Sequence, residues 1–337
     1  MAETILVTGG SGFLGGHLAA SLYSQGYRVV VFDLRMPEKD SAIDWLWRMN
    51  HVQVEFVQGD VSEFEFVKAS CEKYRIDSIV HTAVINNLDV LSNNVPLSLK
   101  VNTLGSVNVL EAAKLSGIKK IIMTSSISVY APRQYEPMDE KHPVHLPDEG
   151  PTLLSYSGTK LAAEALGMHY WATHGIDFIA LRLSAVYGLG MVYPMYIKPI
   201  VENAAENRGT HFDWGKDAKR DYTYVADVVQ GILLALKANP KTRIFNVSAG
   251  GELRSAAEIG AIISEINPQV KVTFEDKVNE VEERTVKTRG ILSIENAKNE
   301  LGYRPQYPLE KGVQEYYEFY KRFLASGKEG KNESCRT

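Results

Sequence analysis

Residues 4–15 have the sequence TILVTGGSGFLG, an apolar run that leads at once into a glycine-rich turn and an apolar helical segment. Gly10, Gly12 and Gly15 satisfy the pattern G-x-G-x-x-G, and Gly9, Gly12 and Gly15 satisfy G-x-x-G-x-x-G. Glycine at these positions lets the chain turn sharply, brings backbone N–H groups against a pyrophosphate and packs the helix on the strand. The start of the helix adds a partial positive charge. The stretch therefore predicts a cradle for the diphosphate of a dinucleotide.

Asp33 supplies a carboxylate at the place where a dinucleotide-binding fold carries one. Asp33 ends the next apolar run, residues 28–32, roughly 20 residues after the glycines, where a carboxylate accepts a hydrogen bond from the ribose 2′-hydroxyl. Alternatively, Asp33 is a strand-end residue that caps the next turn. A carboxylate at this place repels a 2′-phosphate, so NAD is favoured over NADP, whereas Arg35 is close enough in sequence to turn toward such a phosphate.

Short apolar runs alternate with longer segments of helical periodicity through the first half of the chain. The predicted strands are residues 4–8, 28–32, 52–57, 78–81, 120–124 and 177–183, and the predicted helices are residues 13–25, 43–50, 63–74, 96–116 and 152–174. Several strands are continuous Val, Ile and Leu runs, which is typical of a parallel sheet covered on both faces. The pattern predicts an α/β fold of the Rossmann type, a doubly wound parallel sheet.

Beyond residue 183 the alternation loosens, and short strands mix with predicted helices at residues 225–238, 256–266, 294–301 and 309–324. We expect an NAD-binding Rossmann domain over residues 1–183, to which residues 222–249 return. A smaller C-terminal substrate-binding lobe is expected over residues 184–221 and 250–326, at the carboxyl edge of the sheet where open α/β sheets bind ligands. Residues 327–337 are polar and are predicted to form a flexible tail.

Composition narrows the class of protein. The 337 residues are 45% hydrophobic, which excludes a largely disordered chain, and 37 Lys and Arg against 41 Asp and Glu give a net charge of −4, so nucleic-acid binding is not expected. Cys71 and Cys335 cannot form a disulfide framework and lack metal-ligand spacing, so no metal is expected. The longest uncharged apolar stretch, residues 183–197, is short and interrupted by glycine and proline, and the first residues do not resemble a targeting leader. We therefore expect no membrane segment and a cytoplasmic protein.

Six motifs together resemble the extended branch of the short-chain dehydrogenase/reductase superfamily, its NAD-dependent epimerase/dehydratase family. They are TGGSGFLG at residues 8–15, GDV at 59–61, HTA at 81–83, SSISVY at 125–130, YSGTK at 156–160 and RDYTYVAD at 220–227, with ELGYRP at 300–305 as a weaker seventh. Each motif alone is loose, but their order and spacing are specific. The resemblance implies an NAD-dependent enzyme that oxidises a secondary hydroxyl of a sugar or nucleotide-sugar.

The resemblance also implies roles for individual residues. Asp60 and Val61 would hold the adenine, and Ala83 would line the cofactor groove. The full set implied for NAD is Gly9, Gly12, Phe13, Leu14, Gly15, Asp33, Asp60, Val61, Ala83, Tyr156 and Lys160. Simpler interpretations exist: Asp60 caps the helix that follows it, and His81 is a strand-end histidine with satisfied hydrogen bonds, which we prefer to a catalytic role for His81.

The catalytic group that the resemblance implies is Ser126, Tyr156 and Lys160, with Ser126 also contacting the substrate. Residues four apart share a helix face, so Lys160 is expected beside the Tyr156 phenol, whose ordinary pKa of about 10 a neighbouring ammonium lowers. We expect Tyr156 to take a hydroxyl proton while the carbon beneath it gives a hydride to NAD. A second Tyr-x-x-x-Lys pair, Tyr317 and Lys321, is expected to be a solvated or packing face.

Three reactions share this first step: release of the ketone, return of the hydride to the opposite face, and elimination before reduction. Dehydratases of the family carry acidic residues directly after the catalytic hydroxyl residue, whereas Ile127 and Ser128 stand there in this chain, which disfavours dehydration. The hypotheses left are a nucleotide-sugar 4-epimerase, an NAD-dependent dehydrogenase of a smaller hydroxylated substrate, and a non-catalytic NAD-sensing module. The presence of Ser126, Tyr156 and Lys160 argues against the sensing module, because a non-catalytic protein does not need them.

Arg220 bears on whether the substrate carries a nucleotide. It matches the arginine with which the family grips a nucleotide-sugar diphosphate, a task that suits a guanidinium, or it is a surface arginine paired with a nearby aspartate. Two departures weaken the nucleotide-sugar interpretation: Ala185 stands where many relatives have an asparagine, and residues 189–192 lack a proline–arginine pair. Arg284 and Arg289 are alternative sources of positive charge, or they belong to a solvated loop.

The two long helices expected at residues 96–116 and 152–174 carry apolar residues beyond one face. In the second helix these are Leu161, Ala162, Ala165 and Leu166. Helices in these positions pair into a four-helix seam in the family, so the resemblance implies a homodimer. Alternatively, the apolar residues only cover the sheet.

Overall fold

The computed structural model of the protein describes residues 2–144, 154–277, 279–280 and 289–333. Within these residues the centre of the fold is a seven-stranded parallel sheet in the order β10-β6-β5-β4-β1-β2-β3. Its strands are β1 (Thr4–Thr8), β2 (Arg28–Asp33), β3 (Glu55–Gln58), β4 (Ser78–His81), β5 (Lys120–Ser126), β6 (Asp177–Leu183) and β10 (Ile244–Val247). The sheet winds outward from β1 in both directions, so the predicted Rossmann-type α/β fold is confirmed.

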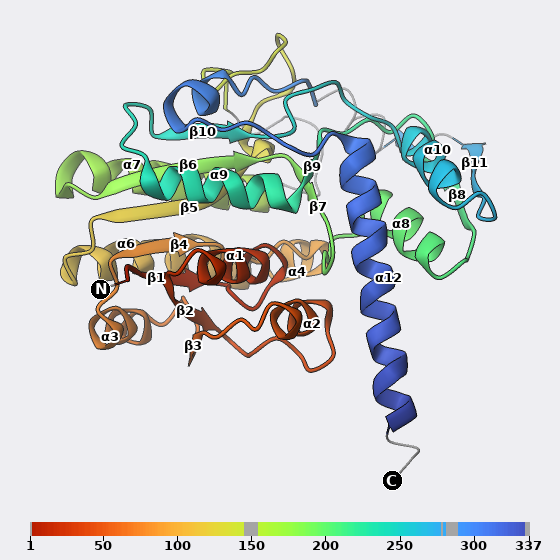
Figure 1. Cartoon of the computed structure of the whole chain (residues 1–337). Helices are drawn as coiled ribbons and strands as arrows, with labels where there is room; N and C mark the ends of the chain where they lie inside the picture. The colour runs from red at the N-terminus through yellow and green to blue at the C-terminus, as the bar shows by residue number, and fades with distance from the viewer. Residues whose placement is uncertain (1, 145–153, 278, 281–288, 334–337) are drawn as a thin grey trace.

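Helices cover both faces of this sheet (Figure 1). One layer consists of α1 (Phe13–Ser24), α2 (Ala42–Met49) and α9 (Val225–Lys237), and the other of α3 (Phe64–Tyr74), α6 (Gly105–Leu115) and α7 (Leu154–His174). Successive residues of a strand point to opposite faces, so Ile5 and Val7 join one core and Leu6 joins the other. The strands are continuous apolar runs because both of their faces are buried.

The second half of the chain builds a smaller lobe beyond the carboxyl ends of the strands, at the right of Figure 1. Its strands pair in parallel, β7 (Ala185–Tyr187) with β9 (Tyr222–Tyr224) and β8 (Thr210–Trp214) with β11 (Val272–Lys277). The long helix α12 (Leu309–Glu333) packs against α8 (Ile197–Ala205) and α10 (Ala256–Ile266). Because ligands of such sheets bind at the carboxyl edge, the lobe stands over the expected site.

The prediction of one regular helix over residues 96–116 is wrong, because a π-helical turn interrupts it. The chain forms α4 (Leu88–Asn93), α5 (Val95–Ser98), a π-helical turn (Leu99–Leu104) and then α6. Inside the π-turn, the Asn102 side chain accepts from the backbone N–H of Ile85 at 2.7 Å and donates to its carbonyl at 3.0 Å. The widened turn thus fixes a segment beside the carboxyl end of β4, an arrangement that helical periodicity alone does not predict.

Three smaller differences concern element bounds. Strand β3 begins at Glu55 and not at residue 52. The helix predicted at residues 294–301 is present from residue 295, but it is π-helical over Ala297–Leu301, and it is ended as predicted by Gly302 in the left-handed region at φ 74°. Helix α12 continues to Glu333, past the predicted end at residue 324 and into the segment predicted to be a tail. Cys335 lies outside the described residues. In the described part of the chain, no helix has the length and apolar character needed to cross a membrane.

Candidate active site

A cavity of about 1260 Å³ opens between the carboxyl edge of the sheet and the lobe. It collects all the site residues predicted from the sequence. These are Gly9, Gly12, Phe13, Leu14, Gly15, Asp33, Asp60, Val61, Ala83, Ser126, Tyr156, Lys160 and Arg220. Residues far apart in the chain meet here because the strands that carry them are parallel and end at the same edge.

The glycine turn at one end of the cavity is too tight for side chains. Gly9 has φ +68°, and a β-carbon on it would lie 2.7 Å from the Ala83 backbone. A β-carbon on Gly15 would lie 2.2 Å from the carbonyl oxygen of Gly9. Gly12 is the N-cap of α1, so the first backbone N–H groups of this helix face the cavity without a capping side chain. These features form a cradle for a diphosphate.

Asp33 ends β2 beside this turn. Its carboxylate accepts hydrogen bonds from the backbone N–H of Ser11 at 3.0 Å and of Leu34 at 2.7 Å. Burial raises the pKa of Asp33, while these hydrogen bonds and the charge of Arg35 oppose the rise. The carboxylate is thus fixed in place and can accept from a ribose hydroxyl, and the exposed Arg35 stands close by.

The next wall is made by the ends of β3 and β4. Asp60 Oδ1 accepts from the backbone N–H of Ser62 at 2.8 Å, which caps the turn before α3. Val61 is buried, and the backbone N–H of Ala83 lies 3.5 Å from the Thr8 hydroxyl. Asp60 thus stabilises the turn before α3 and lines the cavity, whereas the N-cap of that helix is Glu63.

Ser126, Tyr156 and Lys160 meet in the middle of the cavity. Ser126 ends β5, while Tyr156 and Lys160 lie one turn apart on α7. Both hydroxyls line the cavity, and the Ser126 side chain lies near enough to the Tyr156 phenol to oppose the rise in its pKa. Lys160 Nζ lies 5.9 Å from the centre of the Tyr156 ring and donates to the carbonyl oxygen of Thr124 at 2.7 Å. Two hydroxyls and an ammonium group thus line the same part of the cavity.

The predicted lowering of the phenol pKa is not found in the protein alone. Burial raises the pKa of Tyr156 to about 12, although the nearby Ser126 side chain opposes the rise. Burial also lowers the pKa of Lys160 to about 8, against the raising influence of Glu164. The predicted lowering fails for two reasons. The Lys160 ammonium donates its hydrogen bond to a backbone carbonyl and not to the phenol. Burial of the phenol also disfavours its ionised form more than the nearby ammonium favours it.

Two other motif residues have structural surroundings. His81 Nδ1 is hydrogen-bonded to the Thr8 hydroxyl at 2.7 Å and Nε2 to the Ser106 hydroxyl at 3.1 Å, and burial lowers the pKa of His81 to about 3. It is a buried strand-end histidine with satisfied hydrogen bonds. Tyr317, of the second Tyr-x-x-x-Lys pair, is buried on α12 away from the cavity lining, and Lys321 is exposed.

Two arginines reach the cavity near the lobe. Arg220 is half-buried and lies two residues before β9, and its backbone pairs with that of Arg254. Arg289 Nη1 donates to the carbonyl oxygen of Ile127 at 3.3 Å. Burial and the charge of Arg220 lower the pKa of Arg289 to about 10. Arg284 lies outside the described residues.

Sequence analysis missed a buried ion pair below the catalytic group. Glu164, one turn after Lys160 on α7, is paired with Arg182 of β6, and both side chains are almost fully buried. The Ser125 hydroxyl donates to Glu164 Oε1 at 2.5 Å, so the pair also contacts the strand that carries Ser126. An acidic residue within a helical stretch gives no sign of this role, because its partner is placed only by the sheet.

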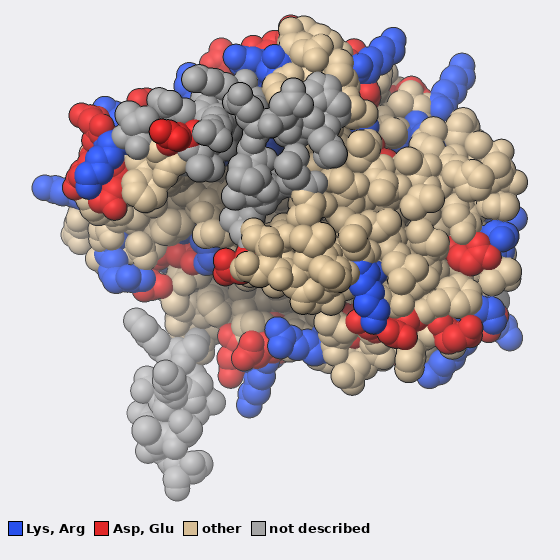
Figure 2. Space-filling view, turned by 180° about the vertical axis from the view of Figure 1, so that it is seen from behind, with Lys and Arg blue, Asp and Glu red and all other residues tan. Residues whose placement is uncertain are grey.

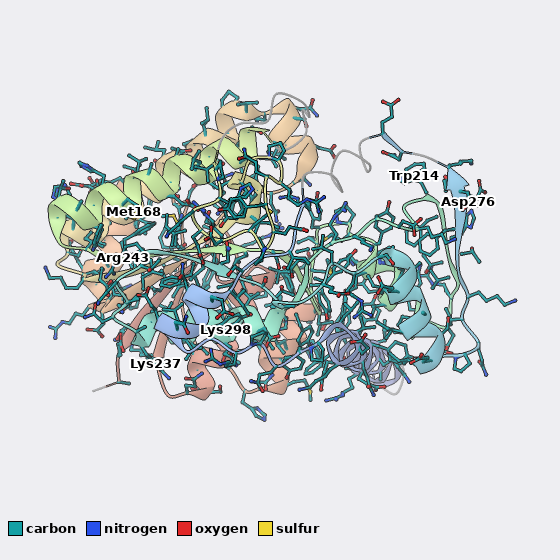
Figure 3. All side chains as sticks on the ribbon, turned by 90° about the horizontal axis from the view of Figure 1, so that it is seen from above. Met168, Trp214, Lys237, Arg243, Asp276 and Lys298 are labelled. Atoms are coloured by element: carbon teal, nitrogen blue, oxygen red, sulfur yellow. The ribbon has the colours of Figure 1, made fainter. Side chains whose placement is uncertain are left out.

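The outer end of the cavity is formed by residues of β8. Figure 3 shows Trp214 and Asp276 together at the far end of the lobe, away from Met168 and Arg243 on the side of the sheet. Trp214 lines the cavity and is 39% exposed. An exposed aromatic side chain at this rim can pack on a planar ligand group.

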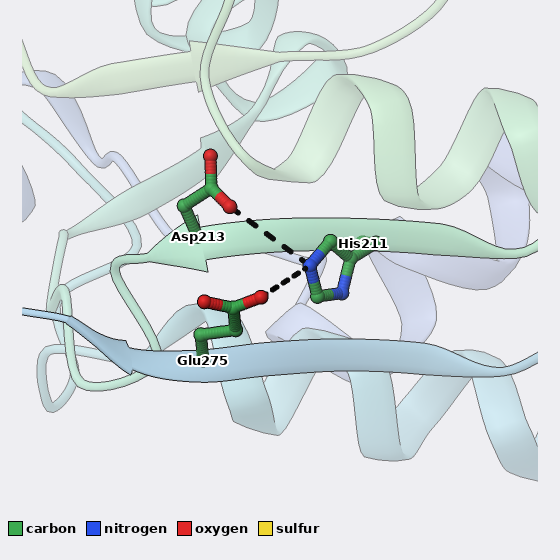
Figure 4. Close-up of side chains that lie close together, drawn as sticks. All are labelled: His211, Asp213 and Glu275. Atoms are coloured by element: carbon green, nitrogen blue, oxygen red, sulfur yellow. Dashed lines mark ion pairs between the residues drawn. The ribbon is translucent and has the colours of Figure 1, made fainter.

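Three potential metal ligands lie on the same two strands (Figure 4). His211 Nε2 is 3.4 Å from Glu275 Oε1 and 4.0 Å from Asp213 Oδ1. The Lys277 ammonium lies 2.8 Å from Glu275 Oε2 and 3.6 Å from Asp213 Oδ1, so it neutralises the same carboxylates. We assign these exposed side chains to a surface network of ion pairs.

Comparison with known proteins gives a consistent set of relatives. A model of the NAD dependent epimerase/dehydratase family matches residues 5–248. The dTDP-D-glucose 4,6-dehydratase of Mus musculus is 26% identical over 325 residues, which cover 95% of this chain and 89% of that protein. The UDP-glucose 4-epimerase of Lacticaseibacillus casei is 29% identical over 325 residues, which cover 90% and 92%.

A solved structure extends the likeness to both parts of the fold. The UDP-glucuronic acid 4-epimerase from Bacillus cereus, in complex with UDP-glucuronic acid and NAD, superposes with a TM-score of 0.77 at 24% identity. The match covers 95% of this chain and 99% of that chain. The similarity therefore includes the lobe as well as the sheet.

Proposed function

Because the chain belongs to the NAD-dependent epimerase/dehydratase family, we propose that it is a nucleotide-sugar 4-epimerase. The observation that carries the proposal is the continuous cavity, which runs from the glycine turn past Tyr156 to Arg220. Single small-molecule sites have volumes of about 300–1,000 Å³. A cavity of about 1260 Å³ is large enough for a dinucleotide and a second nucleotide-linked ligand together.

The glycine turn and Asp33 fit NAD. The turn leaves space for a diphosphate where a β-carbon would collide with backbone, and Asp33 presents a fixed acceptor for a ribose hydroxyl. NAD held there would supply the acceptor for a hydride from the substrate carbon. We propose that Asp60, Val61 and Ala83 form the rest of its groove.

We propose that Tyr156 moves the proton of the reacting hydroxyl and that Ser126 holds the same oxygen. The phenol is protonated at neutral pH in the protein alone, because burial raises its pKa. A positive charge near the phenol favours its ionised form, the phenolate. Lys160 supplies one such charge from the next turn of α7. Tyr156 can then act as base in the oxidation and as acid in the reduction.

Two features separate epimerisation from dehydration. Ile127 and Ser128 follow Ser126 and carry no carboxyl group, so they cannot move the proton that an elimination requires. The relative with the higher identity of the two reported above is a UDP-glucose 4-epimerase. We therefore propose that the hydride returns to the opposite face of the same carbon, and that residues 184–221 and 250–326 hold the nucleotide-sugar.

The test is to incubate the purified full-length enzyme with NAD and a panel of UDP-sugars in heavy water. We expect the 4-epimer to form, without accumulation of NADH and without deuterium on the epimerised carbon, because the hydride does not exchange with solvent. Net NADH would instead indicate a dehydrogenase, and deuterium in a deoxygenated product a dehydratase. Absence of reaction with every sugar would contradict the proposal.

Two matched tyrosine variants test the assigned base. Tyr156→Phe is expected to lower kcat at least about 100-fold, the usual contribution of general acid–base catalysis. Tyr317→Phe removes the same hydroxyl from the second Tyr-x-x-x-Lys pair, outside the cavity lining, and is expected to keep normal kcat. Equal activities of the two variants would remove Tyr156 from the mechanism.

We also propose a cytoplasmic homodimer that associates through α6 and α7. Figure 2 shows a broad face with few charged side chains on the side where these helices cover the sheet. Large apolar side chains exposed on this part of the chain are Val95, Leu97, Leu99, Leu104, Leu115 and Trp171. Sedimentation velocity at micromolar concentration tests the proposal: Leu104→Lys should shift a dimeric species to monomer, and a monomeric wild type would contradict it.

A further inference from the structure

Two neighbouring serines end strand β5, and the protein has to distinguish between them. Ser125 and Ser126 are consecutive, and successive side chains of a strand point to opposite faces of the sheet. A slip of β5 by one residue would bring Ser125 to the place of Ser126 and turn every other side chain of the strand to the wrong face. A specific contact is therefore needed to fix which hydroxyl stands beside Tyr156.

Glu164 of α7 makes this distinction. Ser125 Oγ donates to Glu164 Oε1 at 2.5 Å, and Ser125 is only 4% exposed. Ser125 shares its face of the sheet with Met123, which belongs to the core under α7. The Ser126 hydroxyl instead accepts from the backbone N–H of Ser128 at 3.1 Å and lies in the cavity wall. The carboxylate thus binds the first serine and leaves the second to the cavity.

Arg182 completes this contact from the neighbouring strand. It lies directly opposite Ser125 in the pairing of β5 with β6, and it donates two hydrogen bonds to the same Glu164 carboxylate. One carboxylate therefore ties two adjacent strands to α7. Because all three residues are almost fully buried, these hydrogen bonds are stronger than the same contacts in water.

A second contact joins the same strand to the same helix. Lys160, one turn before Glu164 on α7, donates to the carbonyl oxygen of Thr124 at 2.7 Å. Thr124 directly precedes Ser125. Two successive residues of the strand are thus tied to two successive turns of the helix, so neither element can slide along the other without breaking both contacts.

Glu164 also acts on the charge of Lys160. Burial lowers the pKa of Lys160 to about 8, and the Glu164 carboxylate opposes this fall. The same carboxylate that orders the end of β5 therefore helps to keep a positive charge on the helix face that carries Tyr156.

We propose that Ser125 and Glu164 are positioning residues of the epimerase reaction, which clamp β5 to α7 and so place the Ser126 hydroxyl beside the Tyr156 phenol. This inference rests on the proposed 4-epimerase function. Ser125 acts through Ser126, its neighbour on the strand, and Glu164 acts through the face of α7 that it shares with Tyr156.

Ser125→Ala tests the clamp, because it removes one hydroxyl and leaves the ion pair of Glu164 with Arg182 in place. We expect kcat of the NAD-loaded enzyme, expressed per NAD-binding site counted by calorimetry, to fall about tenfold, since small misplacements of catalytic groups are costly. The Kd values for NAD and UDP should stay unchanged. Unfolded molecules are not counted in this way, so a merely structural role would leave kcat per site unchanged. Ser125→Thr, which keeps the hydroxyl, should retain kcat.

Ser78→Ala is the matched control. Ser78 Oγ donates to Glu3 Oε1 at 3.0 Å, and Ser78 is also 4% exposed, but it begins β4 at the opposite end of the sheet and does not line the cavity. This variant should keep normal kcat per site. Equal values for Ser125→Ala and Ser78→Ala, or a Ser125→Thr variant as slow as Ser125→Ala, would overturn the inference.

Hydrogen–deuterium exchange of the free protein makes the test independent of turnover. Ser125→Ala should speed the exchange of backbone amides in residues 154–164, because the helix loses one of its ties to β5, whereas Ser78→Ala should not. If the wild type epimerises no sugar, the proposed function is wrong, and the exchange still decides whether Ser125 holds α7. Unchanged exchange in Ser125→Ala would overturn the inference in either case.

Discussion

Arg182 donates two hydrogen bonds to Glu164, from Nε to Oε1 at 3.0 Å and from Nη2 to Oε2 at 2.7 Å. Their side chains are only 4% and 3% exposed. The other side of the guanidinium lies 4.7 Å from the centre of the Tyr130 ring. This pair joins α7 to β6 directly below the catalytic group, so the position of Tyr156 and Lys160 depends on a buried salt bridge.

Glu164→Gln should destabilise the protein strongly. The substitution keeps the shape of the side chain but leaves the buried Arg182 charge without its counter-charge, which costs about 3–5 kcal/mol. Urea unfolding followed by circular dichroism measures the free energy of unfolding. Glu72→Gln is the matched control, because Glu72 forms an exposed pair with Lys68 and should lose less than about 1 kcal/mol. Equal losses for the two variants would show that the buried pair has no special role.

Gly15→Ala should weaken NAD binding about fivefold or more. The added β-carbon would lie 2.2 Å from the Gly9 carbonyl oxygen, so the glycine turn must shift, and overpacking of this size costs at least about 1 kcal/mol. Titration calorimetry with NAD gives the dissociation constant, and thermal unfolding of the free protein reports whether the fold is kept. Gly251→Ala meets open space and should leave NAD affinity unchanged. Wild-type affinity in Gly15→Ala would contradict a cradle at this turn.

Asp221 should make the protein less stable as the pH rises from about 4 to 6. Burial raises the pKa of this carboxyl to about 6, whereas the unfolded chain releases the proton near about 3.9. Between these two pKa values the folded state keeps a proton that the unfolded state has lost, so the free energy of unfolding falls as the pH rises. The fall ends once the pH exceeds the pKa of the folded state, where the carboxyl is ionised in both states. At pH 7 the ionised group costs roughly 3 kcal/mol.

Asp221→Asn removes this titration. We expect urea unfolding at a series of pH values to show a flatter profile between about pH 4 and 6, and a stability above that of the wild type at neutral pH. Asp217→Asn, an exposed neighbour, should leave the profile unchanged. A wild-type slope in the Asp221→Asn variant would mean that Asp221 does not titrate in this range.

The parts of the fold that local sequence could predict are those in which neighbours along the chain decide the structure. The turn from β1 into α1 is set by Gly9, Gly12 and Gly15, and the parallel sheet by apolar runs that must be buried on both faces. Spacing within α7 likewise predicted that Tyr156 and Lys160 share a face.

The rest depends on contacts between distant segments. The π-turn at Asn102 is accompanied by hydrogen bonds of its side chain with the backbone of Ile85, which lies in the loop between β4 and α4. The pKa of Tyr156 rises because the folded protein buries the phenol, a property of the closed cavity and not of the motif. Glu164 gave no signal, since Arg182 becomes its partner only when β6 lies beside β5.

The pairing of β10 with β6 has a consequence for engineering. Ile244 lies opposite Ala180, so the chain leaves the sheet at the end of β6, builds much of the lobe and re-enters the sheet as the adjacent strand. A fragment cut after Leu183 would expose the whole edge of β6, an invitation to aggregation. Grafting of a foreign specificity module is better made as an insertion between these two strands, because their parallel pairing then keeps the edge of β6 covered.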